Sequence, residues 1–394
     1  MVSVSEAEKI IQDHLFSPKT EQVSLEFADG KVLAEEIKAD RDLPPFDRAT
    51  MDGIAISFKS FEKGQREFQI EGIQAAGQPQ QTLDDEKKCF EIMTGAPLPN
   101  GTDSVIPYES IVIEDIIAKL SGSVEKNQNV HHRGSDANQN DTLLSPGFPI
   151  LPAEVALLAS VGKSEVQIFK NPKAAIISTG DELVEIDQMP LPHQIRKSNS
   201  YMLASALKEL GCKADLFHLI DNEQEIKGKL KEILNNYELI ILSGGVSKGK
   251  FDFVPQVLES LGVEKLFHQV SQRPGKPMWF GRTERNIVFA LPGNPVSTFM
   301  CFHRYVKLWI TKSLDHEIEK QSAVLAENFS FPPSLTYFLQ VKIKNENGKL
   351  MAYPKTGGGS GDFANLKDVD GFLELPLERS NFLKGESFPL IQFR

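Results

Sequence analysis

The chain has 394 residues, a formal net charge of −11, and 40% hydrophobic and 25% charged residues. This length exceeds one ordinary hydrophobic core and predicts two to four domains of a globular protein. The acidic balance argues against wholesale nucleic-acid binding, because basic surface supplies most of that affinity. The sequence carries no membrane-length apolar run, no signal-peptide pattern and no closely spaced cysteine pair, so we expect a cytoplasmic protein without a disulfide framework or zinc site.

The N-terminal part predicts a short helix followed by a β-rich module. Ile10, Ile11 and Leu15 recur at helical spacing, which predicts an amphipathic helix that begins at a cap at Ser5. From about residue 40 to residue 136, short β-like runs alternate with Gly, Pro and Asn clusters. These runs cover residues 54–56, 68–70, 89–92 and 104–106. Residues 151–161 then predict a helix that ends at Gly162.

From Pro172 onward, apolar runs alternate with helical stretches. The predicted strands cover residues 174–178, 215–220, 239–242, 266–270 and 287–291. The predicted helices cover residues 201–210, 223–235, 254–261 and 296–310. This alternation predicts βαβ units in a doubly wound, mostly parallel sheet. Ligands of such sheets bind beyond the carboxyl ends of the strands, so the loops after the strands are the places to search.

After about Ser313 the helical pattern fades, and alternation returns at residues 337–343. A small β-barrel-like domain is expected there. We therefore predict a multidomain α/β plus β protein. Its parts are an N-terminal helical linker region and β-rich module (1–171, with the β-rich insert at about 40–136), an α/β domain (172–313) and a C-terminal β domain (320–394).

Three loops at predicted strand ends, at residues 178–183, 243–252 and 291–297, are rich in glycine and small hydroxyl residues. Glycine lets the backbone approach a ligand, and amides at helix starts bind anionic oxygens. One such loop is explained as well by a tight turn. Three in one domain favour a site for a bulky, phosphate-bearing small molecule.

The second loop matches a nucleotide-binding P-loop only in part. Gly244, Gly249 and Lys250 have the right spacing, but Phe251 stands where a Ser or Thr would hold Mg²⁺. The sequence also has no GxGxxG after a strand, which removes the usual dinucleotide fingerprint. A P-loop NTPase is therefore the weaker interpretation.

Charged residues recur at the same loop ends. Glu182, Asp221 and Asp252 would repel a phosphate unless a cation such as Mg²⁺ lies between them. They could instead be helix caps or first-turn acids, an alternative that is strongest for Asp221. Arg273 and Lys276 lie in a stiff Pro/Gly frame, which favours an anion clamp.

Taken together, the loops resemble the molybdopterin-binding domain of the MoeA type, which is also found in the E domain of gephyrin. The sequences that carry the resemblance are TGDEL at 179–183, SGGVS at 243–247, PGKP at 274–277 and LPGNPVS at 291–297. It extends to PFDRATMDG at 45–53, AGQP at 76–79, IMTGAP at 92–97, RGSD at 133–136 and GGSG at 358–361. The resemblance thus covers nearly the whole chain.

This resemblance implies a molybdopterin molybdenumtransferase, which acts at the last common step of molybdenum-cofactor synthesis. Its substrates would be adenylylated molybdopterin and molybdate, and it would release AMP with the help of Mg²⁺. The implied catalytic residues are Asp52, Thr94, Asp136, Glu182, Asp221, Asp252 and Lys276, with Glu182, Asp221 and Asp252 as the metal ligands. The implied cofactor-binding residues are Thr179, Gly180, Ser198, Asn199, Ser243, Gly244, Gly245, Ser247, Arg273, Gly275, Pro292, Gly293, Asn294, Pro295 and Ser360.

The resemblance also implies a homodimer with the cleft between subunits, because Asp52, Thr94 and Asp136 would face a partner's α/β domain. Other cofactor-synthesis proteins are further candidate partners, whereas nucleic acid and membrane are not expected. The chain departs from the family pattern in places. Gln340 stands where the family commonly has an arginine that contacts molybdate, although Lys342 is nearby.

Two other classes remain open. The first is a non-catalytic molybdopterin-binding carrier or scaffold of the same family, against which the intact acidic residues argue. The second is a nucleotide-processing enzyme that shares only the α/β domain. The Met51-Asp52-Gly53 motif and the C-terminal β domain argue against the second class.

Overall fold

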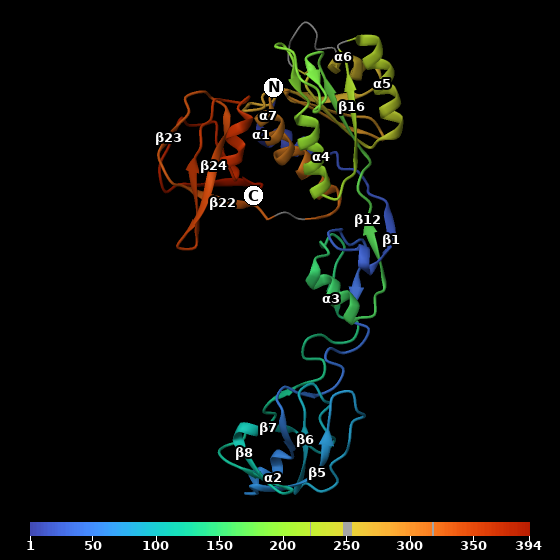
Figure 1. The fold of residues 1–394 in the computed structure, drawn as a ribbon, viewed down its shortest axis with the longest axis vertical. Helices are drawn as coiled ribbons and strands as arrows, with labels where there is room; N and C mark the ends of the chain where they lie inside the picture. Colours follow the sequence, from blue (N-terminus) through green and yellow to red (C-terminus); the bar gives the residue numbers. More distant parts are fainter. Residues whose placement is uncertain (221, 247–253, 317–318) are drawn as a thin grey trace. The chain divides into compact units, whose positions relative to one another are not determined.

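The computed structural model describes residues 1–220, 222–246, 254–316 and 319–394, and the chain forms two compact units (Figure 1). Unit 1 comprises Met1–Ala34, Gly147–Leu151 and Gln167–Arg394. Unit 2 comprises Glu35–Pro146 and Pro152–Val166, so it is inserted in the sequence of unit 1. Within the described ranges, every helix is too short or too polar to cross a bilayer.

Unit 2 is built on a six-stranded sheet in the order β7-β4-β6-β5-β9-β8. The strands are β4 (Gly53–Ile56), β5 (Glu67–Gln74), β6 (Lys88–Ile92), β7 (Ser104–Pro107), β8 (Ile111–Glu114) and β9 (Ile117–Leu120). All neighbours are antiparallel except β5 and β6. The four predicted β-like runs fall within β4, β5, β6 and β7, which confirms a β-rich module.

Short elements complete unit 2. They are β2 (Ile37–Lys38) paired with β11 (Thr142–Leu144), β3 (Arg48–Ala49) paired with β10 (Val130–His131), α2 (Phe58–Glu62), η2 (Tyr108–Ser110) and α3 (Pro152–Ser160). Fully buried Ile54, Ile56, Phe68 and Cys89 lie in the core beneath the sheet. Ala55, Ile92 and Val105 pack in a second core, so β4, whose four residues are all buried, is covered on both faces.

The central sheet of unit 1 has the order β16-β13-β17-β21-β20-β18. The strands are β13 (Ala174–Thr179), β16 (Ala214–Leu219), β17 (Leu239–Ser243), β18 (Glu264–His268), β20 (Trp279–Arg282) and β21 (Ile287–Leu291). The first four in spatial order are parallel, and β20 pairs antiparallel with both β21 and β18. The carboxyl ends of β13, β17 and β21 therefore meet at one edge of the sheet.

Helices cover both faces of this sheet (Figure 1). They are α4 (Asn199–Glu209), α5 (Glu223–Asn236), α6 (Val254–Ser260), α7 (Pro295–Cys301), the π-helical turn η3 (Phe302–Val306) and α8 (Lys307–Ser313). Ile176 and Ile241 pack on the side of α4 and α8, whereas Ile177 and Ile240 pack on the side of α5 and α6. Both faces of the parallel strands are buried, which explains why these strands read as unbroken apolar runs.

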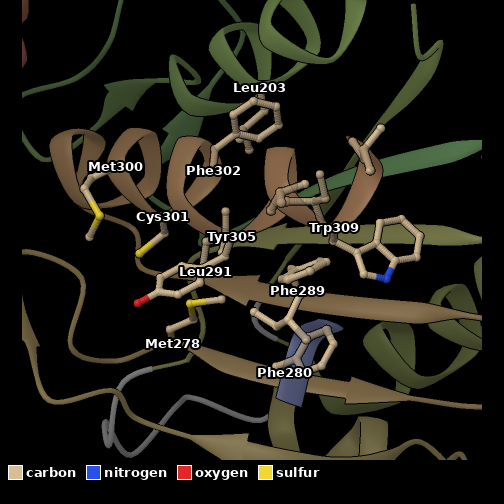
Figure 2. Packing of buried hydrophobic residues seen from close by; sticks show 14 of the residues in the cluster. Leu203, Met278, Phe280, Phe289, Leu291, Met300, Cys301, Phe302, Tyr305 and Trp309 are labelled. Atoms are coloured by element: carbon tan, nitrogen blue, oxygen red, sulfur yellow. The ribbon is translucent and has the colours of Figure 1, made fainter. Parts of the chain in front are cut away.

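Large side chains fill the α4–α8 face of the sheet. Phe280, Phe289 and Trp309 lie together in this core, with Tyr305 and Cys301 beside them (Figure 2). All three cysteines of the chain are buried and free. Burial raises the pKa of the Cys89 and Cys212 thiols to about 12. At neutral pH these cysteines are therefore packing residues rather than reactive thiolates.

The N-terminal helix differs from the sequence prediction. Helix α1 covers Val4–Gln12 and is capped by Ser3, whose hydroxyl accepts from the Glu6 N–H while the Glu6 carboxylate accepts from the Ser3 N–H. The prediction placed the cap at Ser5 and extended the helix to Leu15. Both were wrong, because the reciprocal capping box at Ser3 fixes the start and Leu15 is exposed beyond the end.

The C-terminal part of unit 1 forms the expected barrel. Strands β24, β25, β22, β28 and β26 pair in that order, and β26 pairs back with β24 to close the ring. They cover β22 (Gln321–Leu325), β24 (Thr336–Glu346), β25 (Lys349–Pro354), β26 (Gly371–Leu375) and β28 (Ser387–Gln392). The short strand β19 (Gln272–Arg273) joins β24 in parallel. The loop after β19 is thereby fixed against the barrel.

Unit 1 also contains several short elements. They are β1 (Thr20–Ser24), η1 (Leu25–Phe27), β14 (Leu183–Val184), β15 (Ile195–Arg196), β23 (Phe329–Ser330), β27 (Asn381–Phe382) and η4 (Phe363–Asp368). Strand β12 (Glu165–Phe169) begins in the sequence of unit 2 and ends in that of unit 1.

A nearly buried arginine links three parts of unit 1. Arg304 in η3 donates to Glu8 of α1 at 2.6 Å and to Glu374 of β26 at 2.9 Å. Burial alone would raise the pKa of Glu8, but the charge and hydrogen bond of Arg304, with Lys320, hold that pKa below its usual value. Glu8 therefore contributes stability above the usual carboxyl pKa of 4.5, and this contribution is lost as the pH falls through the lowered value.

We expect Arg304→Met to lower the free energy of unfolding by about 3 kcal/mol, because it removes the main partner of two partly buried carboxylates and leaves Glu8 only Lys320, at 3.7 Å. Urea denaturation at neutral pH measures this loss. The same titration at a pH below the lowered pKa of Glu8 should show a smaller difference between wild type and variant. A difference that does not change with pH would contradict the assigned role.

Candidate functional site

A cavity of about 550 Å³ lies at the carboxyl ends of β13, β17 and β21. The loop after β19 and the barrel strand β24 also line it. Twelve of the residues predicted from the sequence lie in its wall: Thr179, Gly180, Glu182, Gly244, Gly245, Arg273, Gly275, Lys276, Pro292, Gly293, Asn294 and Ser360. The edge of the sheet expected to bind a ligand is thus the edge that carries the cavity.

The loop after β17 needs its glycines. Gly244 and Gly245 have φ values of +99° and +68°, which L-residues rarely adopt. A Cβ on either residue would lie 2.9 Å from the hydroxyl oxygen of Thr179 at the end of β13. Glycine therefore lets the two strand-end loops approach each other and leaves backbone exposed to the cavity.

The loop after β21 is tied to the barrel. The Asn294 side-chain amide donates to the Ser360 hydroxyl at 2.9 Å, and the Val296 N–H donates to the Ser360 carbonyl at 3.1 Å. Pro295 occupies the first turn of α7, where its missing N–H costs no hydrogen bond. Ser360 is thereby fixed at the cavity although it lies far along the chain.

The loop after β19 brings two cations to the cavity. Arg273 and Lys276 are exposed, and neither forms an ion pair with any residue in the described ranges. Between them, Gly275 has φ +88°, and a Cβ on it would lie 2.5 Å from Cys301 Sγ. The buried Gln272 amide donates to the Gly275 carbonyl at 3.0 Å, and its oxygen accepts from the Tyr305 hydroxyl. The cations are therefore free to bind an anion on a loop held from beneath.

Of the three predicted metal ligands, the structure describes Glu182 alone. Asp221 and Asp252 lie outside the described residues, as does the predicted binding residue Ser247. The Glu182 carboxylate lines the cavity and folds against Gly180, where a Cβ would lie 2.2 Å from its oxygen. It has no hydrogen-bonding partner among the described residues. The described ranges contain no cluster of three His, Cys, Asp or Glu residues suited to a metal.

Asn222 caps the helix that follows Asp221. Its side chain accepts from the N–H groups of Gln224 and Glu225 at 3.0 Å and 3.2 Å. Asn222 is therefore the N-cap of α5, and the sequence-based alternative for Asp221 falls on a residue outside the described ranges.

Four predicted binding residues are not among those that line the cavity. These are Ser198, Asn199, Ser243 and Pro295. The Asn199 side-chain amide donates to the Ser243 hydroxyl at 2.9 Å and to the Gly293 carbonyl at 2.7 Å. Asn199 and Ser243 therefore join the ends of β17 and β21 behind the cavity wall, which makes them supports in this structure.

Gln340 lines the cavity from β24, and its side chain accepts from the Asn365 amide at 3.1 Å. Lys342 is not in the cavity wall, and its ammonium donates to Asp370 at 2.8 Å. The charge of Lys342 is thus paired with Asp370, and the cations that line this wall among the described residues are Arg273 and Lys276.

In unit 2, the predicted residues Asp52 and Thr94 form a pair. The Asp52 carboxylate accepts from the Thr94 N–H at 2.6 Å and from the Thr94 hydroxyl at 2.8 Å. These two bonds, the backbone one first, hold the pKa of Asp52 below its usual value. The next residue, Gly53, has no room for a side chain, because a Cβ there would lie 1.9 Å from the Ile106 carbonyl oxygen. The motif therefore presents an ionised, exposed carboxylate in a fixed position.

The third predicted residue of unit 2, Asp136, accepts from His131. The His131 Nε2 lies 2.8 Å from the Asp136 carboxylate, and its Nδ1 lies 3.1 Å from Arg48 Nη2. A guanidinium can only donate, so Nδ1 must be the acceptor and the ring proton lies on Nε2. Arg48 thus sets the tautomer in which His131 donates to Asp136.

Several residues of the cavity wall were not predicted from the sequence. Gln272, Tyr337, Phe338 and Thr356 all line it. Gln272 could have been found as a polar residue directly before the Arg273-Pro274-Gly275 frame. Tyr337 and Phe338 lie in a predicted strand, and the sequence carries no signal that this strand reaches the cavity.

Together, the glycine-rich strand-end loops, the loop with two unpaired cations and the attached barrel give this α/β protein a cavity suited to a bulky anionic ligand. Three family models match the chain in order. They are the MoeA N-terminal region (domain I and II) at residues 2–162, the probable molybdopterin binding domain at 175–312 and the MoeA C-terminal region (domain IV) at 322–393.

Relatives and solved structures match over the full length. A molybdopterin molybdenumtransferase of Synechocystis sp. is 41% identical over 395 residues, covering 99% of each chain. One from Haemophilus influenzae is 32% identical over 98% of this chain and 96% of that protein. The crystal structure of the MoeA protein from Pyrococcus horikoshii OT3 has a TM-score of 0.86 at 28% identity, covering 100% of both chains. The chain belongs to the molybdopterin molybdenumtransferase family.

Proposed function

We propose that this chain is a molybdopterin molybdenumtransferase, which inserts molybdenum from molybdate into adenylylated molybdopterin and releases AMP in the cytoplasm. The observation that carries the proposal is the composition of one cavity. Glycine-rich loops for a phosphate, two free cations for an oxyanion and a free carboxylate all line the same 550 Å³. Full-length similarity to relatives of that name supports the same activity.

The protein's role in this reaction is to orient the substrates and to stabilise charge, because the dithiolene sulfurs of the substrate are themselves the molybdenum ligands. The loops around Gly244 and Gly293 would bind the pterin phosphate through backbone groups. Arg273 and Lys276 would attract the molybdate dianion, and Ser360 would donate to it. The Lys276 charge would also favour the negative charge that develops on the phosphate as AMP leaves.

A Mg²⁺ ion fits the donor set in part. Glu182 offers a free carboxylate in the cavity, and Asp221 and Asp252 would complete an oxygen-rich set. Such an ion would screen these acids from the bound phosphates. Treatment with EDTA should then abolish AMP release while leaving pterin binding intact, and metal-independent turnover would contradict the Mg²⁺ proposal.

The proposal includes a homodimer in which Asp52, Thr94 and Asp136 of one chain serve the cavity of the other. Mixing an Asp52→Ala chain with a Lys276→Ala chain tests this arrangement. If the two groups come from different subunits, random exchange should restore about a quarter of wild-type turnover, because only mixed dimers have one intact site. Restoration would not occur if both groups act within one chain.

The decisive experiment is AMP release from adenylylated molybdopterin by the purified chain, with and without molybdate. Release that depends on molybdate, with active cofactor formed, supports the transferase. Tight binding without release would instead support a carrier. Localising the protein by fractionation would test the cytoplasmic assignment separately.

We expect His131→Phe to lower AMP release by roughly tenfold, because it removes the donor that holds Asp136 and leaves Arg48 without its acceptor. His131→Gln, whose amide can also donate to a carboxylate, should recover part of the rate. The measurement is kcat for AMP release, with circular dichroism to check the fold. Equal rates for both variants would remove His131 from the positioning of Asp136.

A further inference from the structure

A second cavity, of about 530 Å³, lies at the opposite edge of the central sheet. Its wall includes Lys173 directly before β13, Lys213 directly before β16 and Glu238 directly before β17. These three strands are parallel, so the residues before them lie at the amino edge, whereas the functional cavity lies at the carboxyl edge. The two cavities are therefore separate sites on the same sheet.

The wall of this second cavity is strongly basic in an acidic protein. It contains five lysines and two glutamates, a surplus of three positive charges. The lysines are Lys19, Lys31, Lys170, Lys173 and Lys213. Within the described ranges these lysines form one ion pair, between Lys170 and Glu21 at 3.8 Å. Such a concentration of unpaired charge in one concave site favours an anionic ligand.

The rest of the wall is not simply basic. Phe16 and Phe169 contribute half-buried aromatic rings. The Asn171 amide nitrogen donates to the Leu210 carbonyl at 3.2 Å, whereas its oxygen is buried and has no partner among the described residues. Turning the amide over would set two oxygens against each other, so the orphaned group is an acceptor. A buried acceptor of this kind is satisfied by a ligand or water that donates a hydrogen bond.

We propose that this cavity binds a nucleoside phosphate. The phosphates match the surplus lysine charge, the base matches the aromatic rings, and an N–H or hydroxyl of the nucleoside matches the Asn171 oxygen. The volume suits a ligand of this size, since small-molecule sites commonly enclose about 300–1,000 Å³. Inorganic phosphate would use the lysines alone and leave the rings and the amide oxygen without a role.

Two sources could supply such a ligand: the AMP that the proposed reaction releases, and the nucleoside triphosphates of the cell. Titrating the full-length chain with AMP and with ATP by calorimetry distinguishes them, and inorganic triphosphate serves as the comparison. We expect one nucleotide to bind tighter than inorganic triphosphate. Equal or stronger binding of inorganic triphosphate would overturn the assignment to a nucleoside.

The matched variants each remove two positive charges from unit 1. Lys19→Gln with Lys213→Gln alters the cavity, whereas Lys227→Gln with Lys231→Gln alters α5 outside it. The cavity pair should weaken nucleotide binding by roughly tenfold, and the α5 pair should leave it nearly unchanged. Equal effects would mean a general charge effect and overturn the site.

Lysine acetylation followed by mass spectrometry locates the bound nucleotide. We expect nucleotide to protect Lys19, Lys31 and Lys213 in wild type and equally in Lys276→Gln, which alters only the functional cavity. Protection that disappears in Lys276→Gln would place the nucleotide in the functional cavity and overturn the proposal. This readout does not depend on AMP release, so the outcome is independent of whether the transferase proposal holds.

Discussion

Asp52→Asn is expected to lower AMP release by about a hundredfold or more while the fold is retained, because removing a charged active-site group commonly costs that much. Asparagine keeps the size of the side chain and can still accept from Thr94, so the main loss is the negative charge. The lowered pKa of Asp52 means that the wild-type carboxylate stays ionised down to below the usual value of 3.8. The variant should therefore be slow throughout the neutral pH range. Steady-state AMP release measures the effect.

Asp115→Asn provides the matched control. Asp115 lies between β8 and β9 in unit 2, and its φ of +53° suits asparagine as well as aspartate. This variant removes the same charge from the same unit and should leave AMP release unchanged. If Asp52→Asn turned over at the wild-type rate, Asp52 would have to be removed from the proposed site.

Much of the fold could be predicted because two simple patterns dominate the sequence. Strands buried on both faces give unbroken apolar runs, and these match β13, β17 and β21 closely. The predicted helix at 223–235 likewise matches α5 (Glu223–Asn236), because buried Ile226, Leu230 and Ile233 recur at helical spacing. In these elements local propensity and tertiary packing agree.

The strands at the antiparallel edge of the central sheet were harder to predict from the sequence. The run predicted at 266–270 begins two residues earlier, as β18 (Glu264–His268), and its partner β20 (Trp279–Arg282) was not predicted. Only four residues long, β20 includes Gly281, where a Cβ would lie 2.6 Å from the Glu264 carbonyl oxygen. Glycine in a short run normally argues against a strand, yet here it permits the close approach of β18.

The functional cavity was largely predictable because the topology gathers strand-end loops, and the glycine-rich loops are visible as sequence. The residues that hold these loops in place from behind could not be predicted. The bond between Gln272 and Tyr305 joins residues on different elements, and the tie between Asn294 and Ser360 joins the sheet to the barrel. No local pattern encodes such long-range contacts. The same holds for Arg48 and His131, whose pairing depends on the short strands β3 and β10.

Gly275→Ala is expected to lower AMP release by about a hundredfold and to destabilise unit 1, because the new methyl group has no room. It would lie 2.5 Å from Cys301 Sγ and 2.9 Å from Gln272 Nε2, both of which are buried. Relieving these contacts must move the loop that carries Arg273 and Lys276, and a shift of about 1 Å in positioning groups can cost that factor in rate. Overpacking adds roughly 1–3 kcal/mol to the loss of stability.

Gly262→Ala separates this crowding from backbone strain. Gly262 has a φ of +86°, close to the +88° of Gly275, but a Cβ there meets no atom within 4 Å. Both variants therefore incur the same cost of about 1–2 kcal/mol for a left-handed alanine, and only Gly275→Ala incurs the clash. Urea denaturation and AMP release should show Gly262→Ala as mildly destabilised but fully active. If the two variants lost activity to the same extent, the loop after β19 would not be what positions the cations.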